Sequence, residues 1–128
     1  MMGLTTDRND PGLSSIRSDG QQEVYLVLSD EERAKSFVRP VRRKYIHVAC
    51  GCETTMGQSI AETYARNPKF YGGTFCCGCG RHFNLRDANG PAFLWPDGEP
   101  VGSNAEEAAA WREEQRQSEA KKFAGGGI

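Results

Sequence analysis

The chain has 128 residues, of which 38% are hydrophobic and 26% are charged, and it contains 15 glycines. This length accommodates one small domain with tails, and so modest a share of apolar residues usually needs disulfides or a metal to hold a fold. No apolar run is long enough to cross a bilayer and no apolar signal segment is present, which predicts a protein of the reducing cytosol and disfavours disulfides.

The formal net charge of −1 hides a strong asymmetry along the chain. Residues 1–32 carry −5, residues 33–86 carry +8 and residues 87–128 carry −4. A basic centre between acidic flanks is typical of a protein that binds a polyanion or an acidic protein surface. The other interpretation is that the acidic flanks fold back and neutralise the centre.

The first half of the chain begins with residues 1–21, which are polar and which we expect to form a disordered acidic arm. A strand is predicted over 23–28, where β-forming side chains cluster. Ser29 and Glu32 then have the spacing of a capping box, which predicts a short helix over 30–37 that ends near Pro40. A basic strand is predicted over 41–48.

In the second half, Thr55 and Gln58 form another capping-box pattern, which predicts a helix that stops at Asn67-Pro68. A turn at 70–73, a strand through Phe83 and a hairpin over 91–101 follow. A third capping box over 103–106 predicts a long C-terminal helix. The pattern indicates a small α+β fold with a short sheet, divided into the arm (1–21), a metal-binding core (22–102) and a C-terminal helix with a flexible tail (103–128).

Both histidines and all five cysteines lie in two turns, at residues 47–52 and 76–82. Zinc prefers four thiolate or imidazole ligands, offered in pairs on tight turns. Each turn contains a ligand, two further residues and then Cys-Gly, so we predict His47, Cys50, Cys76 and Cys79 as ligands of one Zn²⁺ ion. The result would be a zinc-ribbon-like core in which two knuckles flank a helix.

Other ligand sets remain open at this point. Cys52 could replace His47 in the first turn, and Cys77 or His82 could replace a ligand in the second turn. If they are not ligands, Cys52 and Cys77 are buried or free thiols that bind nothing.

Enzymatic chemistry is disfavoured by what surrounds these residues. A redox dithiol at Cys76 and Cys79 would need a helix N-terminus, whereas these cysteines precede a predicted strand. The zinc deaminase signature requires Glu where Ala49 stands and Pro where Phe75 stands. Segment 33–86 holds only two carboxylates, too few for a nuclease centre. We therefore expect no enzyme, no catalytic residue and no small-molecule substrate.

The segment from Arg39 to Leu85 resembles small proteins predicted in phages, prophages and their bacterial hosts. Their pattern combines His-x-x-Cys-Gly, Thr-x-Met, Ile-Ala-Glu-Thr-Tyr-Ala-Arg, Pro-x-Phe-Tyr-Gly, Phe-Cys-x-x-Cys and His-Phe, with a trailing Phe-x-Trp-x-Asp-Gly-x-x-Val-Gly. The matching segments here are 47–51, 54–56, 60–66, 68–73, 75–79, 82–83 and 93–102. The resemblance covers about half of the chain and implies the ligands His47, Cys50, Cys76 and Cys79 together with a phage-related origin, but no reaction.

The favoured hypothesis is a non-enzymatic, zinc-stabilised interaction module that acts as a structural or assembly protein, associated with a virion, or as an adaptor. It would dock onto a larger phage or host protein, with Trp95 and Trp111 as anchors. The alternative is a basic zinc-ribbon regulator that binds nucleic acid. Its phosphate contacts would come from Arg42, Arg43, Lys44, Arg66, Lys69, Arg81 and Arg86, and its stacking rings from Tyr45, Phe70 and Tyr71. The expected location is the host cytoplasm or the virion.

Overall fold

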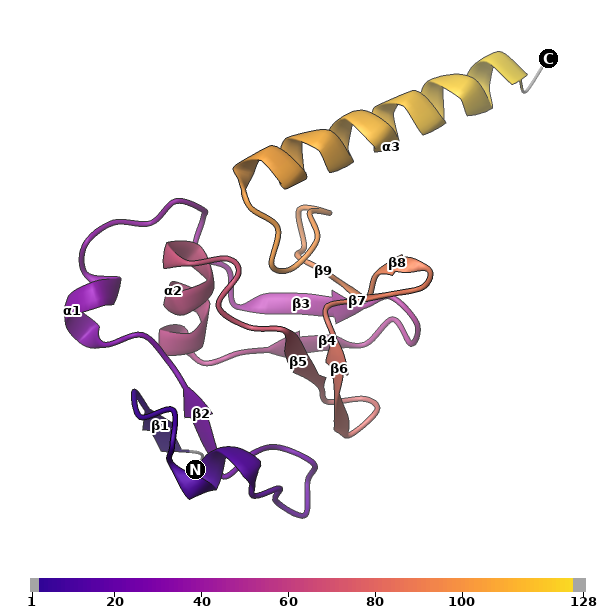
Figure 1. Cartoon of the computed structure of the whole chain (residues 1–128). Helices are drawn as coiled ribbons and strands as arrows, with labels where there is room; N and C mark the ends of the chain where they lie inside the picture. Colours follow the sequence, from indigo (N-terminus) through magenta and orange to yellow (C-terminus); the bar gives the residue numbers. More distant parts are fainter. Residues whose placement is uncertain (1–2, 126–128) are drawn as a thin grey trace.

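The computed structural model describes residues 3–125, with side chains described as far as residue 120. In this part of the chain the fold is a small α+β arrangement of short strands with one long C-terminal helix that projects from the body (Figure 1). None of the described helices combines the length and hydrophobicity that a bilayer crossing requires. The elements in chain order are β1 (Gly3–Thr5), η1 (Pro11–Ser14), β2 (Val24–Leu26), α1 (Asp30–Arg33), β3 (Lys44–His47), β4 (Glu53–Thr55), α2 (Gln58–Arg66), β5 (Gly73–Cys76), β6 (Arg81–Asn84), β7 (Arg86–Asp87), β8 (Gly90–Pro91), β9 (Phe93–Leu94) and α3 (Ala105–Gly125).

The body is organised around the antiparallel sheet β4-β3-β9 and the hairpin β5-β6. Tyr45 on β3 and Phe93 on β9 are almost fully buried, and their rings meet edge to face with centroids 5.6 Å apart. Trp95 joins the same cluster, 6.4 Å from Tyr45 and 5.6 Å from Tyr64 of α2. Edge-to-face aromatic pairs add stability beyond the area they bury. The centre of the body is therefore a small cluster of large rings.

Helix α2 lies in the chain between the two cysteine turns, as predicted, and ends at Arg66, with Asn67 as its C-cap before Pro68. Its start differs from the prediction, because Thr55 belongs to β4 and the helix is preceded by Gly57, which supplies no side-chain cap. The helix buries Ala61 and Tyr64, which lie on one face as their spacing dictates. This face covers the ring cluster of the core.

Residues 3–21 depart from the expected disordered arm. Strand β1 pairs in parallel with β2, and η1 follows it. The turn at Gly20, where φ is +92°, packs directly against the backbone of Gly80 in the second cysteine turn. The polar composition of this segment predicted disorder. The contacts that order it, with β2 and with Gly80, join residues far apart in the chain, and composition does not reveal such contacts.

The predicted cap of α1 is confirmed, since the Ser29 hydroxyl accepts a hydrogen bond from the Glu32 amide at 3.2 Å. The helix is only one turn long, shorter than the predicted 30–37. The chain leaves it because the amides of Val38 and Arg39 both donate to the carbonyl of Ala65 at the end of α2. The following strand is likewise narrower than predicted and occupies Lys44–His47.

The capping box of α3 is shifted by one residue from the prediction. Asn104 and Glu107 exchange hydrogen bonds of 2.9 and 3.0 Å between side chain and backbone, whereas the Ser103 hydroxyl donates to Pro100 at 2.7 Å. Ala108, in the first turn of α3, is 2% exposed. The start of the predicted separate segment 103–128 therefore packs on the body.

Candidate metal centre

The two cysteine turns bring four potential ligands together. His47 ends β3, Cys50 lies in the turn between β3 and β4, Cys76 ends β5, and Cys79 lies in the turn between β5 and β6. One ligand atom from each residue lies within 4.8 Å of the other three. His47 and Cys76 are buried while Cys50 and Cys79 are exposed. The structure thus assembles the set that the sequence predicted, from residues up to 32 positions apart.

The distances within this cluster suit a tetrahedral ion. The sulfur of Cys50 lies 3.3 Å from Nδ1 of His47 and 3.5 Å from the sulfur of Cys76, and the sulfur of Cys79 lies 3.7 Å from Nδ1 of His47. Zn–S bonds of about 2.3 Å and Zn–N bonds of about 2.0 Å give tetrahedral edges of roughly 3.5–3.8 Å. The donor set and the size of the cluster therefore both fit a single metal ion.

The two turns share one backbone design. The amide of Gly51 donates to the carbonyl of His47 at 2.7 Å, and the amide of Gly80 donates to the carbonyl of Cys76 at 2.8 Å. Both glycines have positive φ, at +75° and +69°, a conformation that residues with a Cβ rarely adopt. The repeated pattern of ligand, two residues, Cys and Gly thus corresponds to two matching turns, each of which presents two ligands.

His47 is held in place from several sides. Its amide donates to the Cys52 carbonyl at 3.0 Å, which closes the first turn. Its ring lies between Phe83 and Phe93, with centroid distances of 4.4 and 4.8 Å. Because the imidazole is only 4% exposed and bounded by two rings, its Nδ1 is preorganised toward the sulfurs.

The thiols of Cys50 and Cys79 have pKa values shifted in opposite directions. A backbone hydrogen bond from Cys52 lowers the pKa of Cys50 to about 6, while desolvation raises the pKa of Cys79 to about 11. A thiolate at Cys50 is the species that binds a metal, and a metal ion would favour deprotonation of its neighbours. The lowered pKa therefore favours the metal-binding thiolate form at Cys50.

The three alternative ligands lie outside the cluster. The sulfur of Cys77 donates to the carbonyl of Glu53 at 3.3 Å, and Nε2 of His82 lies 2.9 Å from the Tyr25 hydroxyl. Cys52 is half-buried at the edge of the core and packs against Gly78. No disulfide joins the five cysteines. Cys52, Cys77 and His82 therefore occupy positions beside the four-ligand cluster.

The acidic flanks fold back on much of the basic segment, as the second interpretation of the charge pattern predicted. Of the ten basic residues in 33–86, six form ion pairs with carboxylates from outside that segment, and four of these six reach a carboxylate that is distant in the chain: Arg39, Arg42, Arg66 and Lys69. Within the described part of the chain, four have no carboxylate within 4.0 Å: Arg43, Lys44, Arg81 and Arg86.

Two of the predicted partner-binding residues are used internally. The guanidinium of Arg42 bonds to Asp97 at 2.8 Å and to Glu99 at 2.9 Å and lies 4.7 Å above the Trp95 ring. Trp95 is 3% exposed, so a partner cannot use it as an anchor in this fold. Tyr45, expected as a stacking platform, is buried in the same core.

The remaining partner-binding residues are more accessible. Arg43 and Lys44 are exposed, although Nε of Arg43 donates to the Met56 carbonyl at 3.1 Å. Arg81 is exposed and lies 4.2 Å above the Phe83 ring. Trp111 is half-buried and donates its indole N–H to the Gly98 carbonyl at 2.9 Å.

Glu99 is a structural residue that the sequence patterns missed. Its buried carboxylate binds the guanidinium groups of Arg39, Arg42 and Arg112, which come from the loop before β3 and from α3. Burial by itself would raise the pKa of Glu99, but the three arginine hydrogen bonds outweigh it and lower the pKa to about 2. The sequence signal for this role was weak, because Glu99 shares the predicted hairpin with a second acidic residue, Asp97.

Catalytic zinc sites keep one coordination position for water or substrate, whereas four protein ligands complete a tetrahedron. A metal ion bound by all four residues of the cluster would cross-link the two distant turns. Comparison of the chain with protein-family models, with curated proteins and with solved structures gives no match.

Proposed function

We propose that this chain is a non-enzymatic interaction module whose core is cross-linked by a structural Zn²⁺ ion. The observation that carries the proposal is the meeting of one imidazole nitrogen and three sulfurs from two matching turns. Soft thiolates select zinc over hard cations, and a Cys₃His set is a recurrent structural zinc site. A zinc-ribbon-like core of this kind needs no further chemistry at the metal.

The interaction is assigned to α3 and the hollow beside it. All residues of α3 from Arg112 to Ala120 are exposed, and the helix extends away from the body (Figure 1). A polar helix without packing partners is marginal in water, which favours a role in which another protein covers it. The exposed part of α3, residues 112–120, is therefore the segment that we assign to partner binding.

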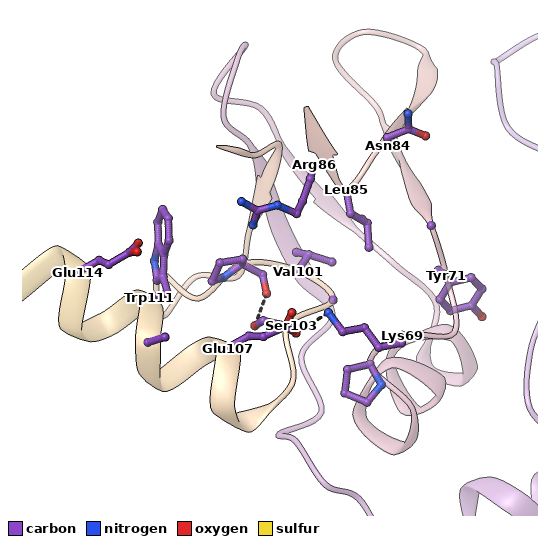
Figure 2. Close-up of a pocket in the computed structure, with 15 residues that line it drawn as sticks. Lys69, Tyr71, Asn84, Leu85, Arg86, Val101, Ser103, Glu107, Trp111 and Glu114 are labelled. Atoms are coloured by element: carbon purple, nitrogen blue, oxygen red, sulfur yellow. Dashed lines mark hydrogen bonds and ion pairs between the residues drawn. The ribbon is translucent and has the colours of Figure 1, made fainter. Parts of the chain in front are cut away.

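A hollow of about 640 Å³ lies between α3 and the body. Figure 2 shows Trp111 and Glu114 on the helical wall, Leu85 and Arg86 on the opposite wall, and the ion pair between Lys69 and Glu107. Apolar groups beside an unpaired guanidinium suit a peptide segment that combines an apolar side chain with an acidic one. We assign this peptide to a larger phage or host protein.

The biological setting follows from the resemblance to phage and prophage proteins. We propose that the chain acts in the host cytoplasm or on the virion, as an adaptor or as a minor assembly component. A chain whose small centre is cross-linked by a metal while a helix projects from it suits docking onto larger subunits.

Co-purification from the native source, with elemental analysis of the same sample, tests this function. We expect one zinc per chain and a stoichiometric protein partner that survives high salt. A variant with Arg86→Glu and Trp111→Ala should lose the partner and keep the zinc, because it removes the guanidinium and the apolar ring of the hollow. The matched control is Lys44→Glu on β3, which is exposed outside the hollow and should retain both. A zinc-free protein, or a partner retained by the variant of the hollow, would contradict the proposal.

Nucleic-acid binding is kept as the second candidate because four exposed basic residues remain without an ion pair in the described part of the chain. If all four met phosphates, the affinity for double-stranded DNA would fall with salt with a log–log slope of about −4 at most. The variant Arg43→Gln/Arg81→Gln should reduce that slope by about 2. Absence of DNA and RNA binding at low salt would exclude this candidate.

A further inference from the structure

We propose that Cys50 and Cys52 form a reversible disulfide when a peroxide oxidises the protein, and that this disulfide withdraws one ligand from the metal. The inference rests on the proposed Zn²⁺ site and names a modification that regulates it. Cys50 belongs to the four-ligand cluster, whereas Cys52 lies outside the cluster and is a free thiol. Gly51 alone separates the two cysteines in the chain.

The sulfur of Cys50 has the Cys52 residue directly beside it. It accepts a hydrogen bond from the Cys52 amide at 3.4 Å. The sulfurs of both cysteines also lie within 3.8 Å of the point where a Cβ on Gly78 would stand. The Cys52 sulfur occupies this space because residue 78 has no side chain. A thiol that is not a ligand therefore lies next to a ligand of the metal.

The turn that carries both cysteines permits their sulfurs to meet. Cα atoms of residues two apart are separated by about 5–7 Å, which overlaps the usual range for disulfides. Gly51 has a φ of +75°, and a Cβ at this position would meet nothing within 4 Å, so the tip of the turn faces open space. A disulfide therefore needs motion within residues 50–52 and no motion between the two turns.

Exposure selects Cys50 as the ligand that meets the oxidant. Cys50 is exposed, whereas Cys76 is fully buried. Peroxide oxidises cysteines according to their thiolate character and their exposure. Cys79 is exposed as well, but the sulfur of Cys77, two residues before it, bonds to the Glu53 carbonyl on β4 at 3.3 Å. The exposed ligand that has a second thiol beside its sulfur is therefore Cys50.

The oxidation takes two steps. The Cys50 thiolate attacks one oxygen of hydrogen peroxide, the O–O bond breaks, and the products are a sulfenic acid and hydroxide. The Cys52 sulfur then attacks the Cys50 sulfur, the S–OH bond breaks, and the Cys52 proton leaves with the hydroxyl group as water. The two sulfurs together lose two electrons, which the peroxide accepts. A dithiol reductant restores both thiols by exchange.

The disulfide weakens the metal site on the side of the first turn. A metal binds the thiolate form of cysteine, so a sulfur in a disulfide is no longer an effective ligand. The first turn then contributes His47 alone, and the second turn still contributes Cys76 and Cys79. Structural zinc sites almost always keep four protein ligands. We therefore expect oxidation to release the ion.

Peroxide treatment of the zinc-loaded full chain tests the site, followed by alkylation of the remaining thiols in denaturant and digestion with trypsin. Basic residues flank both cysteine turns, so trypsin separates them into segments 45–66 and 70–81. The first segment carries only Cys50 and Cys52. We expect it to escape alkylation and to weigh about 2 Da less than its dithiol form, while the zinc is released. Dithiothreitol and added zinc should restore the thiols and the bound metal.

The variant Cys52→Ala supplies the decisive comparison, and Cys77→Ala is its matched control. Neither residue is in the four-ligand cluster, so both variants should bind zinc before oxidation. In Cys52→Ala the sulfenic acid has no second thiol in its turn and proceeds to sulfinic acid, which dithiothreitol does not reduce. The zinc recovered after reduction should then be roughly tenfold lower than in wild type. Cys77→Ala should recover its zinc as wild type does.

Three results would overturn the inference: a disulfide that joins the two segments or lies within 70–81, five intact thiols after peroxide treatment, or full recovery of zinc in Cys52→Ala. Elemental analysis before oxidation separates these results from a failure of the proposed function. A preparation without zinc contradicts that function, and the inference with it, before any peroxide is added.

Discussion

At the scale of single residues, neighbouring cysteines differ sharply in role. Cys76 is fully buried and its sulfur lies 3.5 Å from that of Cys50, whereas Cys77 is exposed and bonds to the Glu53 carbonyl. We predict that Cys76→Ser loses stoichiometric zinc and the folded core, since serine is a poor zinc ligand. The adjacent change Cys77→Ser is the matched control and should keep both. Elemental analysis and near-ultraviolet circular dichroism measure the outcome, and equal zinc contents in the two variants would contradict it.

Gly78 lies where the two cysteine turns pack closely against each other. A Cβ at this position would lie 2.9 Å from Cβ of Cys52 and closer still to its sulfur. We predict that Gly78→Ala destabilises the protein by roughly 1–3 kcal/mol, because overpacking forces the turns apart.

Urea unfolding of the zinc-loaded protein measures this cost. Gly72→Ala is the control, because a Cβ there would meet nothing within 4 Å. Adding Cys52→Ala to Gly78→Ala should recover part of the loss by removing the nearer atom. If Gly78→Ala unfolds at the same urea concentration as Gly72→Ala, the packing argument fails.

At the scale of elements, ion pairs of Glu99 link segments that are distant in the chain. The carboxylate connects the hairpin after β9 to the loop before β3 and to α3. The side chains of Arg39 and Arg42 are only 15% and 13% exposed, so loss of their shared partner would leave buried positive charge. Breaking such a pair is strongly destabilising even when the intact pair adds little.

We predict that Glu99→Gln lowers the free energy of unfolding by about 2–3 kcal/mol, measured by urea denaturation at pH 7. The control Asp97→Asn removes a more exposed partner of the same Arg42 and should cost below about 1 kcal/mol. Similar losses for the two variants would show that Glu99 has no special role in joining the elements.

The same residue predicts a dependence on pH. The pKa of Glu99 is lowered to about 2 in the folded protein, so its contribution is fully present above the ordinary glutamate value of 4.5. The contribution diminishes as the pH falls from there toward 2. The stability difference between wild type and Glu99→Gln should therefore be constant between pH 6 and 8 and narrow below about pH 5. A difference that widens on acidification would reverse the assigned sign.

At the scale of the whole molecule, the fold brings together two cysteine turns that are far apart in the chain. The body has no sheet larger than three strands among its described elements, and its core is one small cluster of rings. We predict that removal of zinc by a chelator unfolds the core cooperatively, because metal-binding energy is folding energy in domains of this kind.

Circular dichroism during chelation, followed by addition of zinc, measures this dependence. The near-ultraviolet signal of Tyr45 and Trp95 should disappear and return, while magnesium should not restore it. A core that keeps this signal without metal would show that the aromatic cluster suffices to hold the fold.

The sequence by itself determined those features that depend on local spacing. The repeated pattern of ligand, two residues, Cys and Gly predicted both turns and the two ligands that each turn presents, since a tight turn with a positive-φ glycine is a local structure. The Ser29 cap and the end of α2 at Asn67-Pro68 were predictable for the same reason. These features require only neighbours along the chain.

Only the tertiary structure determined whether polar segments and candidate surface residues are ordered, buried or exposed. Pairing of β1 with β2 ordered a segment whose composition indicates disorder, and the Glu99 cluster turned Arg42 from a candidate partner contact into an internal one. Trp95 became part of the core rather than a surface anchor. In each case the deciding partner lies many residues away, and the gain from burying rings or pairing charges with it outweighs local preference.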